Sequence, residues 1–298
     1  MKGLISGIKQ MEIHDGQGVR TTVFFKGCPL HCVWCHNPES ISLKPQLAYF
    51  YEKCMACEEC INACDKLALR RGNDSLSIDY EKCSLCGECS RQCPMGALFL
   101  FGVEYEAQEL VDILLQDKPF FDNSGGGVTL SGGECLMQAE FAIEVAKMLK
   151  ENSINVNIDT CGFVSQTVLE KILPYVDVFL YDIKAIDSSL HKKFTGQDNT
   201  LILDNLTFLS KRDAKVEIRI PLVVGLNDGE IKKIGAFLSK LKNSPPVRIL
   251  KYHNFAGSRY KALNMLNALP ENKTNGLEVK KAILTLREFG LTVLNEEE

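Results

Sequence analysis

The sequence lacks any long apolar run, and this absence limits where the protein can act. None of its hydrophobic stretches approaches the roughly 20 residues that a membrane-spanning helix needs. Met1–Gly7 is also without the apolar stretch of a secretory signal. An excess of positive charge is missing too, because 34 Lys and Arg stand against 38 Asp and Glu, a net charge of −4. We therefore expect a cytoplasmic protein with no membrane and no nucleic-acid partner.

The composition excludes the less common classes of protein. Hydrophobic residues make up 45% of the 298 residues and charged residues 24%, as in globular rather than disordered or fibrous chains. This length suits one large domain, or one domain that carries a small insert. Cysteine is the exception, because the chain has 13 of them, and a reducing cytoplasm disfavours disulfides. Metal or cluster ligation is the better explanation of these thiols.

Two groups of four cysteines share one spacing, C-x2-C-x2-C-x3-C, and repeat after 29 residues. They resemble the runs that hold two cubane clusters in bacterial ferredoxins, where the fourth cysteine ligates the other cluster. A pair of zinc sites is the alternative, although zinc sites usually bring cysteines in twos across a long loop. The ferredoxin pattern assigns one [4Fe–4S] cluster to Cys54, Cys57, Cys60 and Cys93, and another to Cys83, Cys86, Cys89 and Cys64.

A third group, Cys28-x3-Cys32-x2-Cys35, has only three cysteines. Three thiolates on a four-iron cluster leave one iron open, as catalytic metal sites do. With Trp34 just before the last cysteine, this spacing resembles the signature of the radical S-adenosylmethionine (SAM) superfamily. In that superfamily the open iron binds the amino and carboxylate groups of SAM. The alternatives are three unrelated buried cysteines, or a zinc site completed by His31 or His36.

Beyond the cysteines, amphipathic helical segments alternate with short apolar strands, which implies a parallel sheet with helices outside. No Gly-x-Gly-x-x-Gly follows the first strand, so an incomplete (β/α)6 barrel is expected rather than a doubly wound sheet. Residues 46–101 form the ferredoxin-like insert, and residues 1–45 and 102–298 form the barrel. The strands are expected at Thr21–Phe25, Gly127–Leu130, Ile154–Thr160, Asp177–Lys184, Val216–Val223 and Val247–Tyr252.

Polar residues recur on one face of two predicted strands. Asn155, Asn157 and Asp159 alternate along one strand, and Glu217 and Arg219 along another. A sheet covered by helices should be apolar on its outer face, so these side chains are expected to point into an interior that holds a polar ligand. Active sites of such barrels gather at the carboxyl ends of strands. The residues at or just beyond such ends are Cys28, Glu134, Asp159, Asp182 and His253.

A set of short motifs along almost the whole chain resembles one branch of the superfamily. The most specific is Ser124–Leu130 (SGGGVTL), followed by Gly132-Gly133-Glu134. Ile13–Arg20, Asp159–Gly162 and Asp182–Lys184 add to it. Together they resemble the activating enzymes of glycyl radical enzymes, such as the pyruvate formate-lyase activating enzyme. The tandem cluster insert resembles the larger members of that family.

The resemblance implies an oxidoreductase that cleaves SAM reductively to a 5′-deoxyadenosyl radical, which takes hydrogen from a glycine of a partner glycyl radical enzyme. Flavodoxin or ferredoxin is the implied electron donor, and a monovalent cation is a further cofactor. Catalytic residues are then Cys28, Cys32, Cys35, Lys184 and Asp15. Cofactor contacts are Trp34, Cys35, His36, Gly132, Gly133, Glu134, Asp182, Ile183, Lys184, Arg219 and His253, with Asp159 and Thr160 at the cation.

Gln17, Cys135 and Lys251 depart from the family pattern. Gln17 stands where the family usually has proline, in a loop thought to face the partner, so partner specificity is left open. Cys135 and Cys161 are expected to be structural, since small buried thiols are common. Two other functions stay open: a different radical SAM chemistry, and a ferredoxin-type electron carrier without catalysis.

Overall fold

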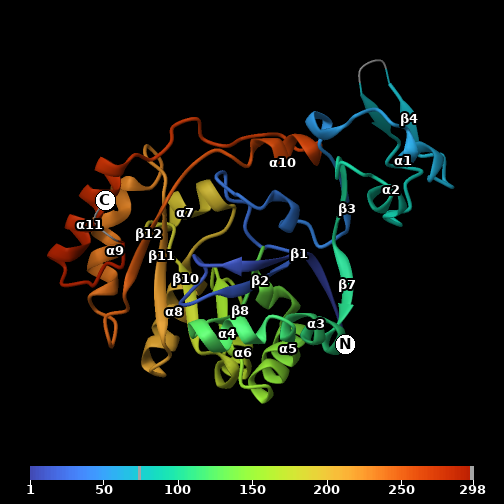
Figure 1. Cartoon of the computed structure of the whole chain (residues 1–298). Coiled ribbons are helices and arrows are strands. Elements are labelled where there is room, and N and C mark those ends of the chain that lie inside the picture. Colours follow the sequence, from blue (N-terminus) through green and yellow to red (C-terminus); the bar gives the residue numbers. More distant parts are fainter. Residues whose placement is uncertain (73–74, 296–298) are drawn as a thin grey trace.

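The computed structural model describes residues 1–72 and 75–295, and its largest element is an eight-stranded sheet. The strand order is β12-β11-β10-β9-β8-β2-β1-β7 (Figure 1). Six neighbouring strands are parallel, which confirms the predicted parallel sheet. They are β2 (Arg20–Phe25), β8 (Gly127–Gly132), β9 (Asn155–Thr160), β10 (Val178–Asp182), β11 (Val216–Leu222) and β12 (Val247–Lys251).

Two further strands extend the sheet beyond β2, and the sequence did not predict them. β1 (Lys2–Glu12) pairs antiparallel with β2, and β7 (Val103–Glu106) pairs antiparallel with β1. Gly7, Lys9 and Gln10 interrupt the apolar alternation of β1, so the pattern of a half-buried strand is lost. Pairing on both sides supplies the stability that local sequence does not.

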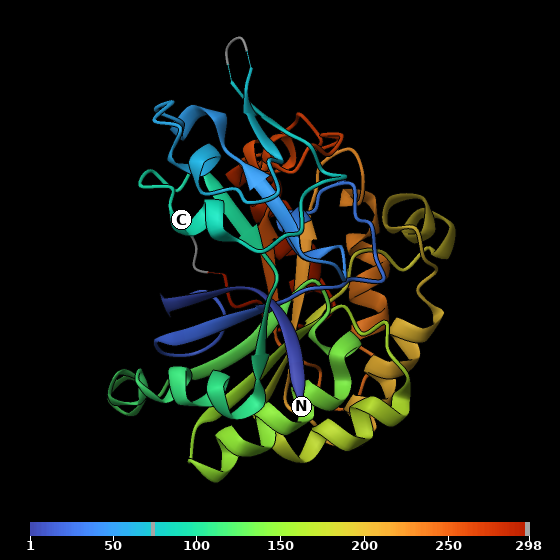
Figure 2. The ribbon, with the colours of Figure 1, turned by 90° about the vertical axis from the view of Figure 1, so that its right-hand side faces the viewer.

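Helices pack on the outer side of the sheet (Figures 1 and 2). The largest apolar core lies between them and the sheet, where Val156 and Ile158 of β9 meet Phe141, Val145 and Leu149 of α5. No helix within residues 1–72 and 75–295 is both long and apolar enough to cross a membrane. The outer helices are α3 (Ala107–Leu115), α4 (Lys118–Ser124), α5 (Ala139–Glu151), α6 (Gln166–Ile172), α8 (Thr200–Lys211), α9 (Ile231–Leu238) and α11 (Gly276–Glu288). α7 (Ser188–Thr195) packs on Trp34 instead, in a smaller apolar cluster.

Residues 46–101 fold into two small hairpin-like sheets apart from the large one. Both views place this segment at one end of the molecule, away from α5 and α6 (Figures 1 and 2). β3 (Gln46–Tyr49) pairs with β6 (Leu98–Phe101), and β4 (Leu69–Arg71) with β5 (Leu76–Ile78). Each pair accompanies one short helix, α1 (Glu59–Asn62) or α2 (Glu88–Arg91).

The 29-residue repeat of the sequence is also a repeat of the backbone. Ala56 and Leu85 both have a positive φ, 57° and 56°, and each precedes one of the short helices. Glu58 and Gly87 repeat the same feature at the helix starts, at 65° and 75°. The two halves of the segment therefore share one local conformation, which the matching cysteine spacing predicted.

The remaining elements are short and lie in connections. α10 (Gly257–Ala262) follows β12. Single 3₁₀ turns are η1 (Pro38–Ser40), η2 (Tyr51–Lys53), η3 (Cys135–Gln138), η4 (Leu173–Tyr175) and η5 (Asp228–Glu230). Of these, η1 lies between Asn37 and Ile41, and η3 directly follows Gly132-Gly133-Glu134.

Candidate active site

A cavity of about 700 Å³ opens at the carboxyl ends of the parallel strands. This is the edge where a parallel α/β sheet gathers functional groups. Most residues predicted to act lie in its wall: Cys28, Cys32, Trp34, Cys35, His36, Gly132, Gly133, Asp159, Thr160, Asp182, Lys184, Arg219 and His253. Asp15, Glu134 and Ile183 were predicted to act here too, and none of the three lines the cavity.

The cysteine loop folds back on itself directly after β2. The amides of Gly27 and Cys28 donate to the carbonyl oxygens of Ser40 (2.8 Å) and Ile41 (3.0 Å), which closes residues 28–41 into one loop. Gly27 has a φ of +100°, a backbone conformation that a side chain would strain. Trp34 packs on Phe194 of α7 at 5.9 Å between ring centroids and holds the loop from the other side.

The chemistry of the three thiols fits a cluster that leaves one iron open. Cys28, Cys32 and Cys35 all face the cavity. Burial raises the pKa of the Cys32 and Cys35 thiols to about 12, so both would ionise only when a cationic group binds them. No three His, Cys, Asp or Glu side chains of the described residues lie close enough to hold a metal ion as they stand, so cluster ligation stays a prediction.

A fourth thiol, Cys161, lies beside Cys28 and also lines the cavity. The two side chains are hydrogen-bonded, and this bond lowers the pKa of Cys28 while it raises the pKa of Cys161. The sequence analysis treated Cys161 as structural. Its place directly after β9, at the edge where the other site residues gather, was the signal that could have found it.

Close packing on the cysteine loop explains the two glycines after β8. A side chain at Gly132, where φ is +111°, would lie 2.3 Å from the amide nitrogen of Phe25. A side chain at Gly133 would lie 2.3 Å from the carbonyl oxygen of Gly27 and 2.4 Å from that of Ser40. Only glycine lets the two backbones approach this closely, and both residues then border the cavity.

Glu134, predicted to contact the cofactor, is buried beside the cavity and does not line it, so that contact stays a prediction. Its carboxylate is fully buried and accepts hydrogen bonds from the Thr160 hydroxyl and the Cys161 amide, both at 2.8 Å, and from the Leu136 amide at 3.1 Å. Burial raises the pKa of this carboxyl group. Glu134 therefore joins the turn after β8 to the end of β9.

Asp182 and Lys184 form an ion pair at the end of β10, in which the lysine is buried and the aspartate half-buried. The Lys184 ammonium donates to the Asp182 carboxylate at 2.6 Å. Burial disfavours the charge of Lys184, but Asp182 and the neighbouring thiols Cys32 and Cys161 outweigh it, so the pKa of Lys184 is raised. The side chain of Ile183 between them packs in the apolar core, and its role as a cofactor contact stays a prediction.

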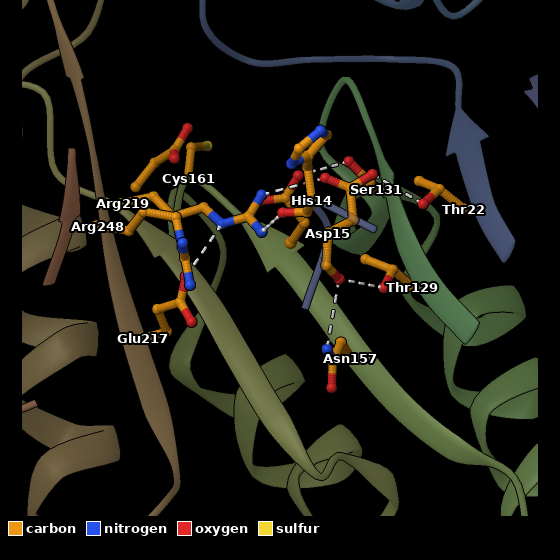
Figure 3. A network of polar contacts seen from close by, with 12 residues as sticks. His14, Asp15, Thr22, Thr129, Ser131, Asn157, Cys161, Glu217, Arg219 and Arg248 are labelled. Carbon is orange, nitrogen blue, oxygen red and sulfur yellow. Dashed lines mark hydrogen bonds and ion pairs between the residues drawn. The ribbon is translucent and has the colours of Figure 1, made fainter. Parts of the chain in front are cut away.

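Arg219 is the centre of a polar network inside the sheet (Figure 3). Its guanidinium donates to the Asp15 carboxylate at 3.3 Å and to the His14 carbonyl at 2.8 Å. Asp15 also accepts from the Thr22 hydroxyl at 2.8 Å, and its carbonyl accepts from the Thr129 hydroxyl at 2.7 Å. The loop between β1 and β2 is thus tied into the sheet interior, with Asp15 engaged and not facing the cavity.

Asp159 and Thr160 lie side by side in the sequence but have different surroundings. Asp159 accepts from the Ser131 hydroxyl at 2.6 Å and lies 4.0 Å from Arg219. Burial raises the pKa of Asp159 to about 7, although Arg219 opposes this. The Thr160 hydroxyl donates a hydrogen bond to the Glu134 carboxylate. A monovalent cation at these two residues therefore stays a prediction.

Two stacked imidazoles form the far wall. The rings of His36 and His253 lie 4.3 Å apart at 10°, and His36 Nε2 is 2.6 Å from the His253 carbonyl oxygen. Burial lowers the pKa of both. Further lining residues were not among the predicted contacts, and they include Ile13, His14, Pro221, Arg248, Leu250 and Tyr252. Pro221, Leu250 and Tyr252 lie at the carboxyl ends of β11 and β12, where strand-end position was the available signal. Ile13 and His14 lie in the loop before β2 and Arg248 near the start of β12, where that signal is missing.

The cysteines of segment 46–101 gather around two separate hollows. Cys54, Cys57, Cys60 and Cys93 line one, and a second of about 220 Å³ is lined by Cys64, Cys83, Cys86 and Cys89. These are the two sets that the ferredoxin spacing assigned. The Ala97 amide donates to the Cys93 sulfur at 3.2 Å, and the Ala68 amide to the Cys64 sulfur at 3.4 Å. Amides so directed stabilise thiolates.

Comparison with known proteins identifies the family to which this chain belongs. Residues 81–238, just over half of the chain, match the model of the radical SAM superfamily. The chain is 48% identical over 265 residues to the trans-4-hydroxy-L-proline dehydratase activating enzyme of Clostridioides difficile, a match that covers 87% of each chain. It is 39% identical over 308 aligned positions to the choline trimethylamine-lyase activating enzyme of Oleidesulfovibrio alaskensis, covering 98% of each.

Solved structures agree at the level of fold. SuiB of Streptococcus suis, in a crystal structure with its precursor peptide SuiA, superimposes with a TM-score of 0.52 and 15% identity. The match covers 89% of this chain and 46% of that one. At this identity the likeness concerns the arrangement of strands and helices only.

Proposed function

Because the chain belongs to the radical SAM superfamily, and within it to the activating enzymes of glycyl radical enzymes, we propose that the cavity at the strand ends is where SAM binds and is cleaved. The chain is an oxidoreductase of that family. When bound, the [4Fe–4S] cluster supplies an electron to SAM, whose cleavage gives methionine and a 5′-deoxyadenosyl radical that takes hydrogen from a glycine of the partner.

One observation carries the proposal: three loop thiols, a glycine pair and an ion pair face a single cavity. Cys28, Cys32 and Cys35 would hold the cluster and leave one iron for SAM. The exposed backbone of Gly132 and Gly133 would accept the SAM amino group, since no side chain covers it. Their contacts to the cysteine loop would keep that backbone at a fixed distance from the cluster.

Charge and ring stacking would orient the rest of SAM. Lys184 and Arg219 place two buried cations in the cavity wall, suited to the SAM carboxylate. Asp182 would accept from the ribose hydroxyls, and Trp34, His36 and His253 would flank the nucleoside end. Asp159 and Thr160 would add the oxygen ligands of a monovalent cation beside the carboxylate.

We assign segment 46–101 as a ferredoxin-like insert in an incomplete barrel, with one [4Fe–4S] cluster in each hollow. The two cysteine sets around the hollows and the repeated backbone support this assignment. Three clusters in all would then connect the cavity to an external donor, a flavodoxin or a ferredoxin. A cytoplasmic location would keep these thiols reduced and free to hold clusters.

The partner would be a glycyl radical enzyme whose glycine loop enters beside Asp15 and His36. The 48% identical relative makes a dehydratase of trans-4-hydroxy-L-proline the first candidate, ahead of a choline trimethylamine-lyase. Since Gln17 lies in the loop thought to face the partner, this choice needs its own measurement.

The test is anaerobic reconstitution with iron and sulfide, reduction, and addition of SAM. About twelve irons per chain with release of 5′-deoxyadenosine and methionine would support a three-cluster radical SAM enzyme. A glycyl radical seen by electron paramagnetic resonance on one of the two candidate enzymes would identify the partner. About eight irons without SAM cleavage would favour the electron-carrier alternative instead.

A further inference from the structure

A short helix links the cysteine loop to segment 46–101. α10 contacts η1, which ends the cysteine loop, and it also contacts β3 at the base of the segment. Figure 1 shows α10 above the sheet, between the large sheet and the projecting segment. Its residues do not line the cavity, so the proposed cofactor site does not account for these contacts.

Side chains of α10 form hydrogen bonds to the backbone of the cysteine loop. The Tyr260 hydroxyl, on a side chain only 6% exposed, donates to the Cys35 carbonyl oxygen at 3.1 Å. Arg259 donates to the His36 carbonyl at 3.3 Å and to the Glu39 carboxylate at 2.8 Å. The last of the three cysteines and the residues after it are therefore fixed from outside the cavity.

The C-terminal end of α10 packs on the base of the segment. Ala262 and Leu263 form a buried apolar cluster with Ala48 of β3, and Phe50 and Phe101 cover its edge. Ala48 has no exposed surface and Ala262 only 3%. Small side chains in close contact leave little room for independent movement, so a shift of β3 must displace α10.

A second tie runs beneath the same loop. Lys26 is fully buried, and its ammonium group donates to the Glu39 carbonyl and, at 3.0 Å, to the Gln46 side chain. Gln46 is the first residue of β3. The buried Lys26 ammonium thus joins the end of the cysteine loop to the start of the segment, the same two parts that α10 connects.

We propose that Tyr260 and Arg259 are positioning residues for the Cys35–Glu39 backbone, and that α10 transmits the packing of segment 46–101 to this loop. How firmly Cys35 is held then depends on contacts at β3, which involve no residue that lines the cavity. The segment has a mechanical role of its own, separate from any electron transfer through it.

Amide hydrogen exchange of the full-length protein tests this, with iron and sulfide reconstituted and without. We expect Tyr260→Phe to exchange the amides of residues 31–41 roughly fivefold faster, the effect of losing one buried hydrogen bond. Leu263→Ala, which removes part of the apolar cluster with Ala48, is expected to speed up amide exchange in the same residues. Tyr181→Phe is the matched control, because it removes a similar bond, from the Tyr181 hydroxyl to the Ile202 carbonyl, inside the core.

A spectroscopic measurement separates positioning from general stability. In Tyr260→Phe we expect a higher apparent KM for SAM with a smaller change in kcat, and an altered paramagnetic resonance signal when SAM is added. If the amides of residues 31–41 exchange at the wild-type rate in Tyr260→Phe or in Leu263→Ala, the proposal is overturned. Equal acceleration in Tyr181→Phe, or faster exchange throughout the chain, would also overturn it. The metal-free measurement needs no cluster, so its failure is distinct from failure of the proposed function.

Discussion

The Lys184 ammonium lies 2.6 Å from the Asp182 carboxylate in the wall of the cavity, and 7% of the lysine surface is exposed. We expect Lys184→Met to weaken SAM binding roughly tenfold to a hundredfold. The change removes a cation from the proposed carboxylate site and leaves the half-buried Asp182 carboxylate without its partner. Anaerobic equilibrium binding of SAM to the reconstituted protein measures this.

Lys150→Met is the matched control for that prediction. Lys150 pairs with Asp177 at 2.7 Å, at the other end of the strands and far from the cavity lining. The variant should bind SAM as the wild type does. Unchanged binding in Lys184→Met would place the SAM carboxylate elsewhere.

Gly133→Ala tests the contact between the glycine turn and the cysteine loop. The new methyl group would meet the carbonyl oxygens of Gly27 and Ser40, so the loop must shift, at a cost of about 1–3 kcal/mol. We expect faster iron loss to a chelator from the SAM cluster and a lower melting temperature. Gly7→Ala on β1, where nothing lies within 4 Å, should change neither. Equal iron loss in both variants would mean that the glycine turn does not stabilise the cluster.

The sequence could predict the parts of the site that follow from strand ends and spacing. Cys28, Asp182 and His253 each lie at or just beyond the end of an apolar strand, so their common edge follows from a parallel sheet. The cysteine sets of segment 46–101 were predictable for the same kind of reason, because the repeat constrains both halves equally. Neither inference needs knowledge of distant contacts.

Contacts between distant segments were beyond such patterns. Glu134 follows a strand like the other site residues, yet Thr160 and Cys161 bind its carboxylate outside the cavity. Asp15 sits in a loop whose sequence gives no sign that Arg219, about 200 residues later, holds it inside the sheet. The direction of a side chain depends on such partners, which local alternation does not encode.

Replacing one cysteine in each hollow tests the electron path. In Cys57→Ser with Cys86→Ser, we expect activation with a flavodoxin or ferredoxin donor to slow at least tenfold, because both insert clusters are lost or altered. SAM cleavage with a strong chemical reductant should persist, since Cys28, Cys32 and Cys35 are intact. Cys135→Ala, a buried thiol outside both sets, is the control. Normal activation by the protein donor would rule the path out.

Glu230 lies beside the loop that follows Lys184, and it makes the stability of the fold depend on pH. Its carboxylate accepts from the Ile186 and Asp187 amides at 2.9 and 2.7 Å and pairs with Lys233 at 2.7 Å. Burial opposes its charge, but these contacts outweigh burial and lower the pKa of Glu230. A lowered pKa stabilises the fold above the ordinary value of about 4.3, and this stabilisation is lost as the pH falls through the folded value.

We therefore expect Glu230→Gln to lower the melting temperature of the metal-free protein at pH 7, by the equivalent of about 1–2 kcal/mol. At about pH 3.5, below the ordinary carboxyl pKa, the difference from wild type should shrink, because the wild-type carboxylate starts to be protonated there. Glu170→Gln is the control, since its pair with Arg212 is 3.5 Å long and exposed, and should have almost no effect at either pH. A difference that stays constant between the two pH values would mean that Glu230 acts through packing and not through its charge.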